Sequence, residues 1–194
     1  MKQIVFATNN VHKLDEIRAI MDGRVEVLSL GDINLSGDIP ETADTLEGNA
    51  LQKARWVKEK TGLDCFADDT GLMVEALDGR PGVYSARYAG ESCSPADNVA
   101  KMLDEMKDQD DRRARFTTVI ALIEGEKEMT FEGSVEGEIL RQPEGDGGFG
   151  YDPIFKPTES DCSFAMMTPE AKNSISHRGR ATRKFVDYLL QNKI

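Results

Sequence analysis

Residues 64–74 have the sequence Asp-Cys-Phe-Ala-Asp-Asp-Thr-Gly-Leu-Met-Val, in which a short apolar run is followed by two carboxylates, a hydroxyl and a glycine. An apolar run bounded by a turn-forming residue predicts a buried strand that ends at Asp68 and Asp69, with the chain turning at Gly71. In α/β sheets, ligands gather beyond the carboxyl ends of the strands. Adjacent aspartates repel each other unless a divalent cation, a lysine or water lies between them. The stretch therefore predicts either a Mg²⁺ site or a solvated turn.

Composition limits the classes of function. The chain has 194 residues with 39% hydrophobic and 30% charged residues, which suits a globular protein of one large domain or a domain with two lobes. The net charge of −11 and a pI near 4.7 argue against nucleic acid or an anionic membrane as a partner, because such surfaces are recognised by clustered Lys and Arg. Three separated cysteines and two histidines predict neither a disulfide framework nor a zinc site. The apolar run at 4–7 is too short for a signal peptide and no stretch is long enough to span a membrane, so we expect a cytoplasmic protein.

The amino-terminal segment predicts a strand, a polar loop and a helix. Residues 4–7 are apolar, and residues 11–21 carry apolar side chains at helical spacing. The start of this helix offers an anion site, to which Lys13 adds a positive charge. The alternative is that Asn10 caps the helix and Lys13 is solvated. The loop lacks the glycines of a P-loop or a dinucleotide fingerprint.

A second strand is expected at 25–30, followed by a polar loop at 31–43 that carries Glu41. Asp44 and Glu47 have the spacing of a capping box, which predicts a helix that reaches about Lys60 and ends at Gly62. Asn49 and Lys53 share one face of this helix. Lys53 is either solvated or directed at the acidic stretch.

The second half of the chain predicts a mixed α/β sheet. The expected elements are an irregular loop over 77–87, a helix from Ser94-Pro95 to Met106, an exposed charged turn over 108–115, a hairpin of strands 116–123 and 129–139, a short helix at 168–170 that continues to Lys172 and a final amphipathic helix.

Two further segments predict binding. Phe149 lies in the glycine-rich stretch 145–155, where it is placed to stack on a flat ring; the alternative is a merely flexible loop. His177 and Arg178 are expected at a helix start, where cations are unfavourable unless they meet an anion or a carbonyl acceptor.

The distinctive motifs are Thr8-Asn9-Asn10-Val11-His12-Lys13, Glu41-Thr42, and the segments 47–54, 67–72, 148–153 and 176–181. In this order they resemble the inosine triphosphate pyrophosphatase family, whose members hydrolyse ITP, dITP and XTP to the monophosphate and pyrophosphate. The resemblance runs from Ile4 to the last helix. It implies one domain over residues 1–194 with a two-lobed α/β fold, a long mixed sheet flanked by helices, an active cleft between the lobes, Mg²⁺ dependence and a homodimer.

The resemblance also implies residue roles. The triphosphate-binding loop would consist of Thr8, Asn9, Asn10, Val11, His12 and Lys13. Glu41 and Asp69 would hold Mg²⁺, Asp69 would be the general base, and Lys53 would meet phosphate. The nucleotide pocket would be formed by Thr70, Phe149, Gly150, Tyr151, Asp152, Lys172, His177 and Arg178, with Phe149 stacked on the purine. The chain departs mildly from the pattern at Thr70, where many members have serine, and at Gly48.

Two other classes of function agree less well with the sequence. A haloacid dehalogenase-type phosphomonoesterase carries Asp-x-Asp-Gly-Thr at a strand end, whereas this chain has Asp68-Asp69-Thr70-Gly71 and lacks the second carboxylate of that motif. A catalytically silent nucleotide sensor predicts the loss of a carboxylate or a phosphate-binding lysine, and all are present. For the pyrophosphatase we expect attack of water at the α-phosphorus, and donors at His177 and Arg178 that favour a 6-keto purine over adenine.

Overall fold

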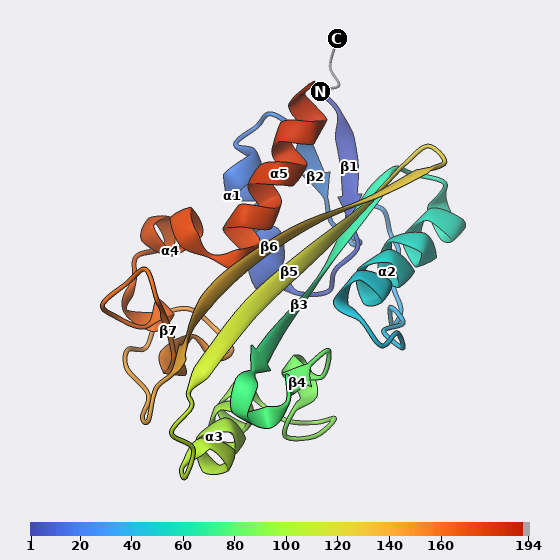
Figure 1. Ribbon diagram of the computed structural model, residues 1–194. Coiled ribbons are helices and arrows are strands. Elements are labelled where there is room, and N and C mark those ends of the chain that lie inside the picture. Colours follow the sequence, from blue (N-terminus) through green and yellow to red (C-terminus); the bar gives the residue numbers. More distant parts are fainter. Residues whose placement is uncertain (192–194) are drawn as a thin grey trace. The chain divides into compact units, whose positions relative to one another are not determined.

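The computed structural model describes residues 1–191, which form one mixed sheet flanked by helices, as expected (Figure 1). In chain order the elements are β1 (Gln3–Phe6), α1 (Val11–Met21), β2 (Glu26–Leu28), α2 (Leu46–Thr61), β3 (Cys65–Val74), β4 (Pro81–Gly82), α3 (Pro95–Met106), β5 (Arg113–Glu124), β6 (Lys127–Ile139), β7 (Phe155–Pro157), α4 (Pro169–Ile175) and α5 (His177–Gln191). Short 3₁₀ turns lie at Glu75–Leu77, Ser85–Arg87, Asp152–Ile154 and Phe164–Met166. None of the helices within residues 1–191 has the length and apolar composition needed to cross a membrane.

The strands follow the order β2-β1-β3-β5-β6-β7, and β4 pairs with β3. Strand β1 is parallel to β2 and β3, whereas β4 is antiparallel to β3 and β7 is antiparallel to β6. The chain divides into two compact units. Unit 1 contains Met1–Asp69, Val119–Glu132 and the segment from Ala181, and unit 2 contains Thr70–Thr118 and Gly133–Arg180.

In unit 1 the alternation of side chains along the strands builds two apolar layers. Ile4, Phe6 and Phe66 face α1 and α5, whose buried side chains complete one cluster. Val5 and Ala67 belong to a second apolar cluster, to which α2 contributes Ala50, Ala54 and Val57. Strands β1 and β3 are therefore covered by helices on both faces in unit 1, and their buried residues 4–6 and 65–67 are apolar, as buried parallel strands require.

In unit 2 a single aromatic-rich cluster forms the core. Its buried members include Leu72 and Val74 of β3, Met102 and Met106 of α3, Phe116, Val135, Ile139, Phe155 and Phe164. The rings of Phe116 and Phe155 meet edge to face with centroids 4.6 Å apart, an arrangement that adds to the stabilisation from apolar burial.

The main correction concerns the acidic stretch. We expected the strand to end at the two aspartates and the chain to turn at Gly71, but β3 runs without interruption from Cys65 to Val74. Two pairings hold its ends: Phe66 lies opposite Phe6 of β1, and Leu72 lies opposite Gly82 of β4. These long-range hydrogen bonds outweigh the local preference of Thr70-Gly71 for a turn.

Two smaller boundaries also differ from expectation. Thr45, not Asp44, caps α2, because its hydroxyl accepts a hydrogen bond from the Gly48 N–H at 3.0 Å. The charged run after α3 is not simply an exposed turn, since Ala114 is buried and β5 already begins at Arg113. Residue Arg112 donates hydrogen bonds to the carbonyls of Ile139, Met106 and Leu140, at 2.6, 2.8 and 2.9 Å respectively.

The other helix ends agree with expectation. Asn10 caps α1 by accepting from the Lys13 N–H, Gly62 ends α2 with φ of 70°, and Ser94 with Asp97 forms a capping box on α3. Helix α5 begins at His177, as the sequence indicated.

Candidate active site

The adjacent aspartates of β3 point to opposite faces of the sheet in unit 1. Successive side chains on a strand alternate, so Asp68 shares the face of Phe66 and Asp69 shares the face of Ala67. Asp68 accepts a hydrogen bond from Lys13 of α1 at 3.1 Å, and Asp69 Oδ1 lies 3.8 Å from Lys53 Nζ of α2. Each buried carboxylate therefore has its own lysine from its own helix, which relieves the repulsion expected between neighbours.

The loop before α1 is ordered by its own side chains. The Thr8 hydroxyl accepts from the Asn10 N–H at 3.0 Å, and the Asn10 side chain accepts from the Lys13 N–H at 3.2 Å. Of the two alternatives, the cap at Asn10 is present, but the side chain of Lys13 is only 15% exposed because its ammonium contacts Asp68. Val11 and His12 are exposed in the first turn, where the positive end of the helix dipole favours an anion.

Lys53 is the centre of a polar cluster in unit 1 that also contains Glu41 and Asp69. Its ammonium donates to Glu41 Oε1 at 2.6 Å and lies 3.8 Å from Asp69 Oδ1. Burial alone would lower the pKa of Lys53, but the carboxylates of Asp68, Asp69 and Glu41 together raise it above its ordinary value. Burial raises the pKa of Asp69, against the opposing effect of Lys53. The cluster therefore combines a fixed cation with a carboxylate of increased basicity.

The Glu41 loop is attached to α2 through polar side chains. Gln52 accepts from the Thr42 N–H and donates to the Thr42 hydroxyl, each at 2.8 Å, and the Asn49 side chain accepts from the Ala43 N–H at 2.9 Å. Asn49 also donates a hydrogen bond to Asp69. The sequence placed Asn49 on the face of Lys53 but outside the site; its position one helical turn before Lys53 was the available signal.

The chemistry of the donor set fits a hard divalent cation that also binds substrate. Within residues 1–191, no three His, Cys, Asp or Glu side chains form a group that could hold a metal alone. Glu41 and Asp69 nevertheless approach one common positive charge, the Lys53 ammonium. Two carboxylates suffice for Mg²⁺ when phosphate oxygens and water supply the remaining ligands.

Unit 2 contains a separate cluster around Phe149. Asp152 Oδ2 accepts from the Phe149 N–H at 2.9 Å and from the buried ammonium of Lys172 at 2.7 Å. The same ammonium lies 4.6 Å from the centroid of the Phe149 ring, and the Arg178 guanidinium carbon lies 5.2 Å from it. The Phe149 backbone is thus held by the Asp152 carboxylate, which is itself paired with Lys172. The cations of Lys172 and Arg178 lie near the partly exposed Phe149 ring.

The first residues of α5 complete this cluster. The Arg178 guanidinium donates to the Thr70 hydroxyl at 3.5 Å, and that hydroxyl shares a 2.8 Å hydrogen bond with Thr118. The His177 imidazole stacks on the Phe116 ring with centroids 4.7 Å apart and planes inclined by 14°. Both basic side chains are buried, so their placement is fixed by packing, not by solvent. Neither Phe116 nor Thr118 carries a sequence signal that would have placed it here.

The remaining residues of the predicted pocket have unequal roles. Tyr151 is buried and its hydroxyl donates to the Ser85 carbonyl at 2.6 Å, so its side chain supports the core of unit 2. Gly148 has a φ of +68°, and a Cβ on it would lie 2.1 Å from Asp152 Oδ2. Gly150 also has positive φ, but a Cβ there would meet nothing within 4 Å. Asn9 is exposed beside Thr8.

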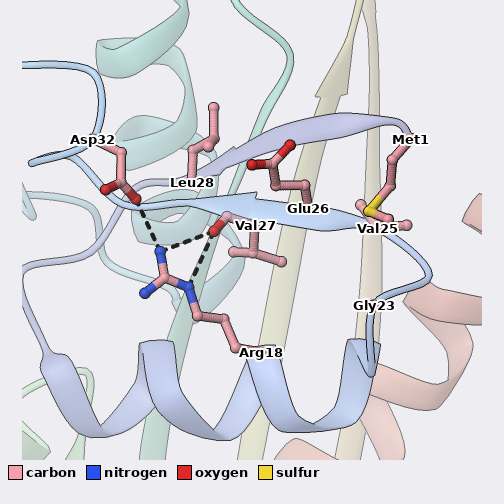
Figure 2. A pocket seen from close by; sticks show the side chains of 8 residues that line it. All are labelled: Met1, Arg18, Gly23, Val25, Glu26, Val27, Leu28 and Asp32. Carbon is pink, nitrogen blue, oxygen red and sulfur yellow. Dashed lines mark hydrogen bonds and ion pairs between the residues drawn. The ribbon is translucent and has the colours of Figure 1, made fainter.

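An open hollow of about 840 Å³ lies elsewhere on unit 1 and contains none of the predicted site residues. It is lined by Met1, Arg18, Gly23, Val25, Glu26, Val27, Leu28 and Asp32 (Figure 2). Its cation, Arg18, already donates to the Val27 carbonyl at 3.1 and 3.0 Å and to Asp32 at 2.9 Å. The predicted site residues described above therefore lie outside this hollow.

Comparison with known proteins gives a consistent result. The model of the Ham1 family matches residues 4–188. A dITP/XTP pyrophosphatase of Porphyromonas gingivalis is 54% identical over 191 residues, which cover 98% of each chain. The solved structure of the Staphylococcus aureus Ham1 protein superposes with a TM-score of 0.91 at 38% identity, covering 99% of this chain and 100% of the other. For a nucleoside-triphosphatase, dITP/XTP pyrophosphatase, of Mycobacterium abscessus the TM-score is 0.78 at 42% identity, with 94% and 98% covered.

Proposed function

Because the chain belongs to the Ham1 family, we propose that it hydrolyses aberrant purine nucleoside triphosphates, namely dITP, XTP and ITP, to the monophosphate and pyrophosphate. The match along almost the whole chain confirms the resemblance first drawn from the six motifs. The observation that carries the proposal is the approach of Lys53 to both Glu41 and Asp69 in an oxygen-rich cluster in which Lys53 and Asp69 are buried and Glu41 is partly exposed. Such a cluster suits phosphoryl chemistry, which depends on positioning and on charge stabilisation.

We propose that unit 1 binds the phosphates. The start of α1 with Lys13, together with Lys53, supplies positive charge for the triphosphate. Asp69 takes the proton of the attacking water, a role for which burial and the resulting increase in pKa suit its carboxylate. Glu41 and Asp69 would hold Mg²⁺, which when bound neutralises phosphate oxygens and polarises the phosphorus.

Unit 2 is proposed to bind the base. Phe149 offers a partly exposed ring for stacking. Its backbone N–H donates to Asp152, which also accepts from Lys172. Arg178 and a donating His177 satisfy the 6-keto oxygen of hypoxanthine or xanthine. Adenine presents an amino group at that position, so donors would face donors and both would remain unsatisfied.

The test is a panel of nucleoside triphosphates incubated with Mg²⁺, with pyrophosphate and orthophosphate assayed separately. We expect pyrophosphate from dITP and XTP, and no turnover once a chelator removes the metal. Orthophosphate as the product would favour the phosphomonoesterase, and nucleotide binding without turnover would favour the silent sensor.

Base selectivity is measured as kcat/KM for dITP, XTP, dGTP and dATP, in the wild type and in Arg178→Ala. We expect dATP to be rejected by roughly 10⁴-fold in the wild type, because a site built on hydrogen bonds excludes an analogue that cannot make them. If dATP were processed within about tenfold of dITP, a difference of ~1.4 kcal/mol, the proposal of a donor pocket would be wrong.

We further propose a cytoplasmic homodimer with neither nucleic acid nor membrane as partner. The net charge of −11 supports the absence of a polyanionic partner, and the family resemblance supports the dimer. Light scattering should give twice the chain mass of 21.5 kDa. The chain mass alone would contradict the dimer.

A further inference from the structure

We infer that Asn49 is a positioning residue that fixes the Asp69 carboxylate and the Glu41 loop relative to each other. The inference rests on the proposed function of the same site. Asn49 lies on α2 and is 1% exposed, which makes it one of the most deeply buried polar side chains among the described residues. A buried amide is costly unless its donors and acceptor are used.

Both ends of the Asn49 amide are used, and they connect two parts of the site. Its oxygen accepts from the Ala43 N–H at 2.9 Å, two residues after Glu41 in the loop. Its nitrogen donates to the carboxylate of Asp69 on β3. Asp69 and the loop that carries Glu41 are thus connected through one side chain on a third element.

The chemistry of the two partners determines which way the amide points. A backbone N–H can only donate, so it must meet the amide oxygen, and an ionised carboxylate can only accept, so it must meet the NH₂ group. The bond to Ala43 therefore holds the NH₂ group toward Asp69. Aspartate at position 49 would keep the first bond but could not donate to an ionised Asp69.

Asn49 and Lys53 both contact Asp69 from one face of α2. The two residues are four positions apart, so they lie about one helical turn from each other on α2. Lys53 contacts Glu41 and Asp69 by charge, with a long and flexible side chain, whereas the short Asn49 side chain sets a direction. Asn49 thus determines which oxygen of Asp69 remains available for water and metal.

The experiment compares Asn49→Ala, Asn49→Asp and Gln52→Ala with the wild type. Gln52→Ala is the matched control, because Gln52 also ties α2 to this loop through two hydrogen bonds but touches neither carboxylate. With dITP and Mg²⁺ we expect both Asn49 variants to lose about 10- to 100-fold in kcat, with KM changed only a few-fold. Gln52→Ala should stay close to the wild-type kcat.

A second readout does not depend on turnover. Mn²⁺ binding to the nucleotide-free protein, followed by electron paramagnetic resonance, should be weakened about tenfold or more in Asn49→Ala and little changed in Gln52→Ala. Circular dichroism checks the fold of each variant, and Asn49→Asp keeps the loop anchored should Asn49→Ala be poorly folded.

The outcomes separate the two proposals. If the wild type releases pyrophosphate from dITP but both Asn49 variants keep kcat and Asn49→Ala keeps its Mn²⁺ affinity, as Gln52→Ala does, the role of Asn49 is wrong and the proposed function stands. If the wild type does not release pyrophosphate, the proposed function fails, and the Mn²⁺ measurement still decides the role of Asn49.

Discussion

Replacing Lys53 with methionine should destabilise the metal-free protein, because it removes a positive charge that lies near both Glu41 and Asp69. Methionine keeps much of the volume and the flexibility of the lysine stem. The ammonium and Asp69 Oδ1 are 3.8 Å apart, and their side chains are only 8% and 12% exposed. The lost contact is therefore a buried one, for which solvent compensates poorly.

The magnitude follows from these distances. At 3.8 Å and an effective dielectric constant of about 20, two unit charges attract by about 4 kcal/mol. The variant no longer has to desolvate the ammonium, and Glu41, with a side chain 37% exposed, recovers much of its hydration. We therefore expect a net loss of about 2–3 kcal/mol in the free energy of unfolding, less than the 3–5 kcal/mol seen for fully buried pairs.

The assay is urea unfolding at pH 7.5 in the presence of a chelator. Lys58→Met is the matched control, because Lys58 lies on the same helix and pairs with Asp64 at 3.2 Å, but with side chains 24% and 32% exposed. It should cost no more than about 1 kcal/mol. If both variants lost the same stability, or Lys53→Met lost none, the account of Lys53 as the cation that stabilises the carboxylate cluster would be wrong.

Three further predictions concern the site and the core. Gly148→Ala should raise KM for dITP at least about tenfold, because its Cβ would displace the Asp152 carboxylate. Gly150→Ala is the control, since it carries only the strain of positive φ, about 1–2 kcal/mol. Equal KM values in the two variants would refute this prediction. Burial raises the pKa of Cys65 to about 12, so at pH 8 only about 10⁻⁴ of this cysteine is thiolate. Iodoacetamide should therefore modify Cys93 and Cys162 first, as detected by mass spectrometry. Early labelling of Cys65 would contradict its burial. Asp69→Asn should lose about 10²–10⁴-fold in kcat while retaining its circular dichroism spectrum, and turnover within a few-fold of wild type would assign the base to another residue.

Local sequence signals were sufficient to predict several of the strands and helices. Apolar spacing and capping residues predicted β1, α1 and α3, and the helical period placed Asn49 and Lys53 on one face of α2. These features depend on residues within a few positions of one another. They are therefore readable before any long-range contact is known.

Local signals did not predict that β3 continues past the two aspartates to Val74. Two aspartates, a threonine and a glycine predict a turn by local preference, but Asp68 and Asp69 are compensated by lysines that are distant in sequence, on α1 and α2. Arg112 shows the same limit, since a charged run predicted solvent exposure and its hydrogen bonds lie with carbonyls at 106, 139 and 140. In both cases the deciding interactions are tertiary.

Unit 2 adds a further case. The glycines and the aromatic residue indicated a binding loop, but nothing local predicted that Asp152 would support the Phe149 backbone while pairing with Lys172. The stacking of His177 on Phe116 likewise joins segments about sixty positions apart, which a single sequence does not reveal.

In the proposed reaction, water attacks the α-phosphorus of a non-standard purine nucleoside triphosphate. Hydrolysis of dITP in ¹⁸O-labelled water, with Mg²⁺ and the wild-type protein, tests it directly by mass spectrometry of both products. Attack at the α-phosphorus predicts one labelled oxygen in dIMP and none in pyrophosphate. Label found in pyrophosphate alone would place the attack at the β-phosphorus and contradict the account.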